Sequence, residues 1–110
     1  MVLKQVFLIN AVFLLLLACQ DNKQQQNEFA NQTPAEQGAS LYSMHCAQCH
    51  GEDGKLGASG AKDLSVSKLS DNQILVLLKN GKGAMPSMKA LLETDQNMNL
   101  VRKHIKGLRK

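Results

Sequence analysis

The chain has 110 residues, 44% of them hydrophobic and 4% aromatic, and its 13 basic and 9 acidic residues give a formal net charge of +4. This length allows one small domain. The charge is mild, and no basic block interleaved with aromatic residues is present, so the composition argues against a nucleic-acid partner.

The amino-terminal segment has the pattern of an export signal. A short positive start, Met1 to Lys4, precedes an apolar run from Val6 to Leu17. A run of about a dozen residues suits a signal-peptide core and is too short to span ~30 Å of hydrocarbon. It ends at Ala18-Cys19, which resembles a bacterial lipoprotein signal, in which cleavage precedes the cysteine and the thiol receives a diacylglycerol. We therefore expect residues 1–18 to be a lipoprotein signal peptide and Cys19 to be a lipid anchor. The alternative is an ordinary signal peptide with an incidental cysteine.

Residues 19–32 form the next segment, which is polar and low in complexity. It contains too few apolar side chains to offset the entropy of ordering the chain. We expect a flexible tether with a typical reach of roughly 20 Å.

Helix-start signals recur three times in residues 33–110. Glu36 and Gln73 each lie three residues after a hydroxyl residue, which predicts two capping boxes. The first helix should run into residues 45–50, the second should end at Asn80-Gly81, and the third should carry apolar residues at helical spacing. No alternating strand pattern is visible, so we predict an all-α domain of three or four helices. The three N-cap residues are Thr33, Ser70 and Thr94.

Between the first two predicted helices lies one Cys-x-x-Cys-His motif, formed by Cys46, Cys49 and His50. Two thiols at this spacing can add to the two vinyl groups of one porphyrin, and the following imidazole can offer its Nε2 to the iron. The motif therefore indicates one covalently bound haem c. In so small a domain, a porphyrin would also supply part of the interior.

Three other functions of the motif suit the surrounding sequence less well. A thioredoxin-like redox pair would need a strand-helix-strand context, which the flanking sequence lacks. A zinc site would need a fourth ligand at suitable spacing, and a zinc-binding domain built on these three residues would be colourless. A disulfide between adjacent turns would cross-link almost no chain and stabilise little.

The order of helices, the CAQCH motif, a glycine-rich loop and the segment NGKGAMP resembles the class I cytochromes c of bacterial electron-transport chains, over about residues 33–110. This resemblance implies the small cytochrome c fold and makes Met85 the second axial ligand of the iron. A thioether is a soft donor that favours ferrous iron. Met88 and His104 are the rival ligands, whereas Met98 lies on a helix face and suits the core.

Two positions depart from the family pattern. Many members have a proline whose carbonyl holds the proximal histidine, and Lys62, before Leu64, stands at that position here. Members also often place an aromatic residue in the last helix. His104 occupies that position, so we expect it to pack near Gly38 and Tyr42 in a contact that is sensitive to pH.

A haem with both axial positions filled by protein has no open site for substrate, which favours single-electron transfer over catalysis. The sequence therefore predicts a monomeric, membrane-tethered electron carrier and not an enzyme. It would be exported, with the haem domain on the periplasmic or outer side of a bacterial membrane. Its partners would be a quinol-oxidising complex, a terminal oxidase or another reductase. The alternative is a haem-based gas sensor or oxidase accessory module whose methionine ligand dissociates. Docking of a redox partner is expected to use a group of lysines around the exposed haem edge beside Met85. They are Lys79, Lys82 and Lys89, and Lys55 extends this group.

Overall fold

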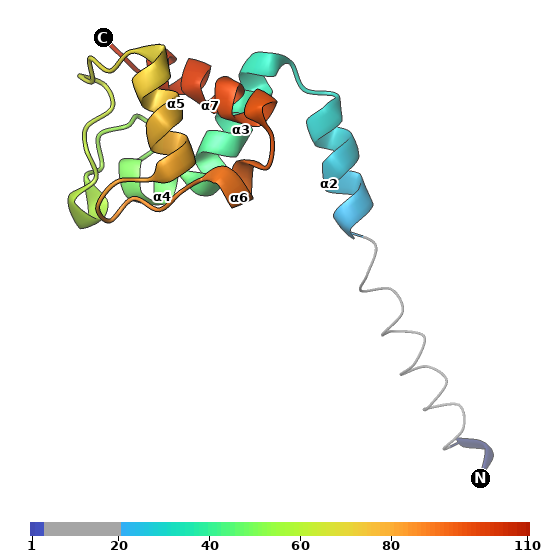
Figure 1. Ribbon diagram of the computed structural model, residues 1–110. Helices are drawn as coiled ribbons and strands as arrows, with labels where there is room; N and C mark the ends of the chain where they lie inside the picture. Colours follow the sequence, from blue (N-terminus) through green and yellow to red (C-terminus); the bar gives the residue numbers. More distant parts are fainter. Residues whose placement is uncertain (4–20) are drawn as a thin grey trace. The chain divides into compact units, whose positions relative to one another are not determined.

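The computed structural model describes residues 1–3 and 21–110 (Figure 1). Cys19 and nearly all of the predicted signal peptide lie outside these residues. The chain divides into two compact units, Met1–Gln32 and Thr33–Lys110, which are described separately. Across the described ranges, no helix combines the length and apolar character needed to cross a bilayer.

In the first unit, helix α2 spans Asp21–Ala30. The sequence predicts no regular structure here, so the helix is a difference from that expectation. Its glutamine, lysine, glutamate and alanine residues are good helix formers. Residues 24–28 and Ala30 are exposed, so α2 presents no broad buried face. Local propensity therefore accounts for this helix better than packing does.

The second unit is all-helical, as predicted. Thr33 and Ser70 each form a complete capping box, and Thr94 accepts a hydrogen bond from the main chain of Asn97. Between the long helices lie two single-turn helices and one turn of 3-10 helix, and strands are absent from the described residues. In chain order the elements are α3 (Pro34–His45), α4 (Ala47–His50), η2 (Ala58–Gly60), α5 (Asp71–Asn80), α6 (Lys89–Leu92) and α7 (Asp95–Gly107).

The core forms where α3 packs on α7, with α5 and α6 against α7 (Figure 1). Gly38 permits the close approach of α3 and α7, since a Cβ atom there would lie 2.6 Å from the carbonyl oxygen of Leu100. The fully buried side chains come from all four of these helices, so the core joins the segments on either side of the motif. They are Tyr42, Leu78, Leu92 and Val101.

Candidate functional site

The motif occupies the junction between α3 and α4. Cys46 closes α3 by donating its main-chain N–H to Tyr42, and its carbonyl then accepts from Cys49 and His50 in the next turn. Its side chain is 8% exposed, whereas that of Cys49 is exposed, and neither thiol is in a disulfide. Burial, reinforced by the nearby Cys49, raises the pKa of the Cys46 thiol to about 11.

His50 is oriented by a main-chain carbonyl. Its Nδ1 lies 3.0 Å from the carbonyl oxygen of Lys62. Because a carbonyl can only accept, Nδ1 carries a proton, and in the neutral ring Nε2 then keeps a free lone pair. The carbonyl expected from the family resemblance is therefore in place, although a lysine supplies it.

The loop that carries this carbonyl is fixed by its own hydrogen bonds. Leu64 donates its main-chain N–H to Gly54, at 2.8 Å. Asp63 accepts from both the main-chain N–H and the hydroxyl of Ser65, at 2.8 and 2.6 Å. The hydroxyl bond from Ser65 lowers the pKa of the Asp63 carboxyl. These bonds hold the residues that follow Lys62 and offset the absence of a proline ring.

Tyr42 connects the end of the motif to α7. Its hydroxyl donates to the carbonyl oxygen of Gly51 at 2.7 Å, and its ring lies 4.7 Å from that of His104, centroid to centroid. Burial raises the pKa of Tyr42 to about 12, so the hydroxyl remains a donor. The predicted packing of His104 near Tyr42 is confirmed, and a Cβ atom on Gly38 would lie 3.6 Å from the Cβ atom of His104.

The segment around Met85 forms a tight loop. Lys82 and Met85 exchange two main-chain hydrogen bonds, at 2.9 and 3.1 Å. Gly81 has φ +70° and ψ 177°, a conformation that is nearly restricted to glycine. A Cβ atom there would lie 2.5 Å from the carbonyl oxygen of Met85 and 2.7 Å from main-chain atoms of Pro86 and Ser87. Gly81 therefore allows the loop to fold back on itself.

The end of this loop is attached to α5. The hydroxyl of Ser87 donates to the carbonyl of Lys79, and the main-chain N–H of Met88 donates to that of Leu78. Met88 is 5% exposed and Met98 2%, so both contribute to the core, while Met85 is half-buried. His104, the other alternative iron ligand, packs on Tyr42. Of these candidate ligands, Met85 has the side chain that is least committed to the core.

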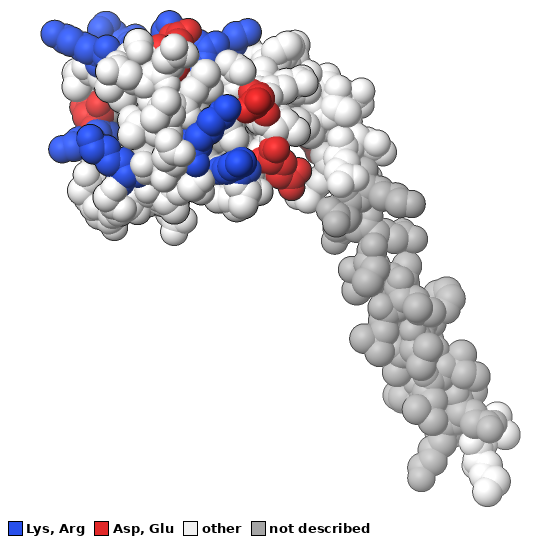
Figure 2. Space-filling view, viewed as in Figure 1, with Lys and Arg blue, Asp and Glu red and all other residues white. Residues whose placement is uncertain are grey.

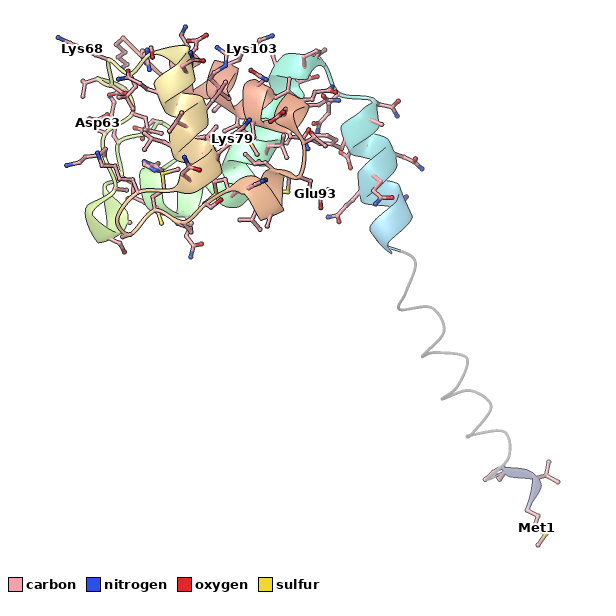
Figure 3. All side chains as sticks on the ribbon, in the orientation of Figure 1. Met1, Asp63, Lys68, Lys79, Glu93 and Lys103 are labelled. Carbon is pink, nitrogen blue, oxygen red and sulfur yellow. The ribbon has the colours of Figure 1, made fainter. Side chains whose placement is uncertain are left out.

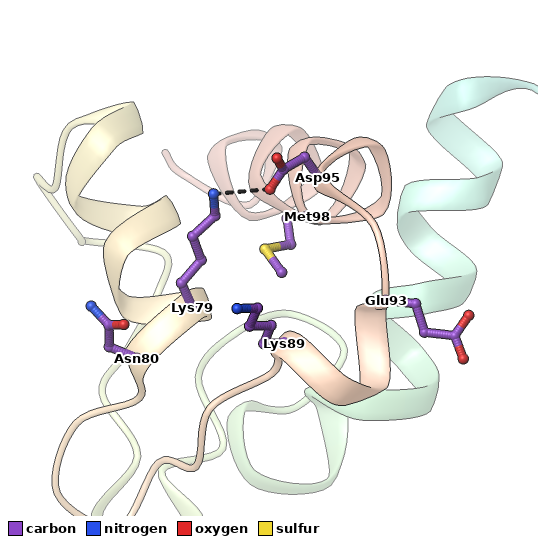
Figure 4. A pocket seen from close by; sticks show the side chains of 6 residues that line it. All are labelled: Lys79, Asn80, Lys89, Glu93, Asp95 and Met98. Atoms are coloured by element: carbon purple, nitrogen blue, oxygen red, sulfur yellow. Dashed lines mark ion pairs between the residues drawn. The ribbon is translucent and has the colours of Figure 1, made fainter.

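One of the lysines near Met85 is paired with a carboxylate. Lys79 forms an ion pair with Asp95 at 2.9 Å (Figure 4). This bond, together with the charges of Lys79 and Lys89, lowers the pKa of Asp95. These groups line a pocket of about 390 Å³ that contains no residue of the Cys-x-x-Cys-His motif. The pair is exposed, and the expected role of Lys79 in docking stays a prediction. The pocket is lined by Lys79, Asn80, Lys89, Glu93, Asp95 and Met98.

The geometry fits covalent haem attachment better than the other interpretations. Among residues 1–3 and 21–110, no group of three or more His, Cys, Asp and Glu side chains is arranged to hold a metal ion. The two unbridged thiols and the free Nε2 of His50 are the groups that a haem requires. Leu56, 61% exposed, lies beside Gly51, since a Cβ atom on Gly51 would lie 2.9 Å from that of Leu56, and it adds an apolar surface directly after His50.

Comparison with known proteins supports the same assignment. Residues 33–102 match the family described as cytochrome C oxidase, cbb3-type, subunit III. The chain is also 34% identical to cytochrome c-551 of Bacillus subtilis (strain 168) over 91 residues, which cover 78% of this chain and 79% of that protein.

The chain belongs to the class I monohaem cytochromes c. Cytochrome c6 of Leptolyngbya boryana is a second relative, 37% identical over 68 residues, which cover 56% of this chain and 79% of that one. No solved structure matches significantly. As a cytochrome c the chain carries one covalent haem c and acts as an electron carrier, not an enzyme.

The sequence indicated Gly81 as a left-handed C-cap of the second helix, and the structure gives it a positive φ but an extended ψ of 177°. It did not indicate the close approach of Gly81 to the Met85 carbonyl or the role of Ser87. One signal was available for Ser87, because the last carbonyls of any helix lack partners and a nearby hydroxyl can satisfy one. Lys79 is within the last turn of α5, so its carbonyl was such an acceptor. The close approach of Gly81 depends on the path of the loop, which local sequence does not specify.

Proposed function

We propose that this cytochrome c is exported, held to a bacterial membrane by lipidated Cys19, and passes single electrons to an oxidase. The family description, a cbb3-type oxidase subunit, supports this class of partner. When bound, the haem supplies a one-electron iron couple. Cys46 and Cys49 would hold it covalently, and His50 and Met85 would be the axial ligands.

The observation that carries the assignment of His50 as an iron ligand is the hydrogen bond from its Nδ1 to the main-chain carbonyl of Lys62. It leaves Nε2 unprotonated on the residue that directly follows the second thiol. The bond also fixes the tautomer and the orientation of the ring, which is how supporting groups tune a histidine ligand. Gly81 and Ser87 restrict the loop that carries Met85, which would be the sulfur ligand.

Covalent attachment is tested by extracting the purified protein with acid-acetone. Colour should remain on the polypeptide, and complete extraction of the haem would contradict the role of the two cysteines. Axial ligation is tested by Met85→Ala, which should abolish the weak sulfur-to-iron absorption band of the oxidised protein. The matched control is Met88→Leu, which keeps the volume of a core residue and should keep the band. If Met88→Leu loses the band and Met85→Ala keeps it, Met88 is the sulfur ligand and Met85 is not.

Carbon monoxide distinguishes an electron carrier from the gas-sensor alternative. A reduced protein that keeps both axial ligands should bind the gas weakly, and tight binding by the wild type would favour the sensor. The anchor is tested separately by Cys19→Ser, which should produce unprocessed precursor or soluble protein. Unchanged fractionation with membranes would show that another feature holds the chain there.

A further inference from the structure

The positive charge of the cytochrome domain gathers at one end of α5 and α7. Residues 102–110 contain five cations and no acid. This end of α7 lies against residues 65–69, because Arg109 donates to the carbonyl of Leu69 at 2.8 Å and Lys110 to that of Ser65 at 3.3 Å. Figure 2 shows Lys and Arg side chains along the upper edge of the domain, where the C-terminus lies in the same view of Figure 1. We call this surface the basic face, and its cations are Lys68, Arg102, Lys103, Lys106, Arg109 and Lys110.

The charge balance of the domain depends on this face. Residues 33–110 contain eleven basic and seven acidic residues. The basic face holds six of the basic residues, and Asp71 is the acid that pairs with it, through Arg102 and Lys106. Five basic and six acidic residues remain elsewhere. The net positive charge of the domain therefore comes entirely from the basic face.

Several of these cations have no partner within the domain. Across the described residues, no carboxylate forms a salt bridge with Lys68, Lys103 or Lys110. Lys68 and Lys103 both lie at the same edge of the molecule in Figure 3, whereas Asp63 lies apart from it. Val66, in the same surface segment, is 69% exposed, more than any other large apolar side chain of the domain. The face thus combines unpaired cations with an exposed apolar side chain.

The basic face is separated from the Met85 loop by the length of α5. This helix begins at Asp71, beside the basic face, and ends at Asn80, directly before the loop. Ten helical residues span about 15 Å. Figure 1 shows the C-terminus and α4, which carries Cys49 and His50, at different ends of the domain. A surface bound to the basic face would leave the Met85 loop accessible.

We propose that the basic face binds an anionic phospholipid surface and so turns the Met85 loop toward the redox partner. The proposal rests on the proposed membrane tether, which keeps lipid headgroups within reach of the domain. Clustered lysines and arginines are attracted to anionic headgroups, and an exposed apolar side chain can enter the headgroup region. An acidic redox protein is the less suitable occupant, because a partner exchanging electrons has to approach the motif.

The test uses the full haem-containing chain reconstituted in two kinds of vesicle. One contains phosphatidylcholine alone, and the other equal parts of phosphatidylcholine and phosphatidylglycerol. The lysines are acylated with an amine reagent, and the label at each is measured by mass spectrometry. We expect the anionic vesicles to reduce labelling of the basic-face lysines several-fold and to leave the other lysines unchanged. High salt should reverse the protection. The protected set is Lys68, Lys103, Lys106 and Lys110, and the internal controls are Lys55, Lys82 and Lys89.

A matched pair of triple variants adds an independent measurement. Lys68→Glu, Lys103→Glu and Lys110→Glu together should abolish protection of the remaining Lys106. The same change of charge elsewhere should preserve the protection; this control combines Lys55→Glu, Lys82→Glu and Lys89→Glu.

The outcomes separate this inference from the tether. If the chain floats together with phosphatidylcholine vesicles but lysine labelling is the same with both kinds of vesicle, the proposed tether stands. The proposed binding of the basic face to lipid is then wrong. If the chain floats only with anionic vesicles and the basic face is protected, the role holds without the anchor. Protection that requires an added oxidase fraction would assign the face to a protein and overturn the proposal.

Discussion

The side-chain hydroxyl of Ser87 lies 2.5 Å from the main-chain oxygen of Lys79. This bond joins the residue two positions after Met85 to the last turn of α5. The same stretch is held by the bond from the Met88 N–H to the Leu78 carbonyl, at 2.8 Å. The loop that presents the proposed sulfur ligand is therefore attached to a core helix on its C-terminal side.

Replacing Ser87 by alanine should loosen this attachment. We expect Ser87→Ala to lower the free energy of unfolding by about 1 kcal/mol, the typical net value of one hydrogen bond. It should also weaken the sulfur-to-iron band at temperatures where the wild type retains it. Ser43→Ala, which removes the exposed bond to Glu52, is the control and should leave the band intact. An equal effect of both changes on the band would contradict the role of Ser87.

Gly81 and Gly83 offer a comparison within one loop. Gly81→Ala introduces a Cβ atom 2.5 Å from the carbonyl oxygen of Met85, at a φ of +70°. Strain of the backbone alone should cost roughly 1–3 kcal/mol, and the contact adds to it. Gly83 has φ +59° but no heavy atom within 4 Å of the added Cβ, so Gly83→Ala should cost only about 1–2 kcal/mol. Urea unfolding of both variants measures the difference, and equal losses would show that the close approach is unimportant.

Tyr42→Phe should destabilise the domain without changing the volume of the ring. The change leaves the carbonyl of Gly51 without its 2.7 Å donor. That carbonyl keeps its bond from the main-chain N–H of Gly54, at 3.1 Å, so the loss should be about 1 kcal/mol, the typical net value of one hydrogen bond. Because Gly51 follows His50, the midpoint potential should shift as well, which redox titration can measure. A loss of stability with an unchanged potential would limit Tyr42 to a packing role.

His104 makes the domain less stable in acid. Burial lowers the pKa of His104 below its usual value of 6.5, although the charge of Glu52 opposes the shift. The unfolded chain therefore takes up a proton first as the pH falls below about 6.5. The contribution of His104 to the free energy of unfolding is therefore fully present above about pH 6.5. It decreases as the pH falls from that value to the pKa of His104 in the folded state. The surrounding titratable groups are Tyr42 of α3 and Glu52 of the loop after α4.

His104→Phe keeps a ring against Tyr42 and removes the proton uptake. The urea midpoint of the variant should therefore change less than that of the wild type between about pH 7 and about pH 5. Lys103→Gln, at an exposed neighbour on α7, should keep the acid-dependent loss of the wild type. Identical pH dependence in wild type and His104→Phe would contradict this origin of the effect.

Local signals in the sequence predicted the parts of the fold that depend on neighbouring residues. Thr33 and Ser70 start helices through capping boxes, which need only four consecutive residues. The family resemblance predicted the Lys62 carbonyl and the place of His104, and both are found. The assignments of Cys46, Cys49, His50 and Met85 remain proposals.

Contacts between distant segments were not predictable in the same way. The Lys79–Asp95 ion pair joins a residue of α5 to one of α7, so the partner of Lys79 could not be read from its own segment. The basic face likewise forms only because the end of α7 packs against residues 65–69. Helix α2 was missed for another reason, since its composition suits both a helix and an unstructured tether.

The burial of Cys46 bears on how the molecule is made. The residue is 8% exposed, so the packed junction of α3 and α4 shields its sulfur from solvent. Thioether formation needs access to that sulfur. Under the proposed attachment, the porphyrin must therefore be joined before the junction of α3 and α4 closes. Biogenesis would then have a fixed order, in which export delivers an open chain, the cofactor is linked, and only afterwards do the terminal helices seal the interior.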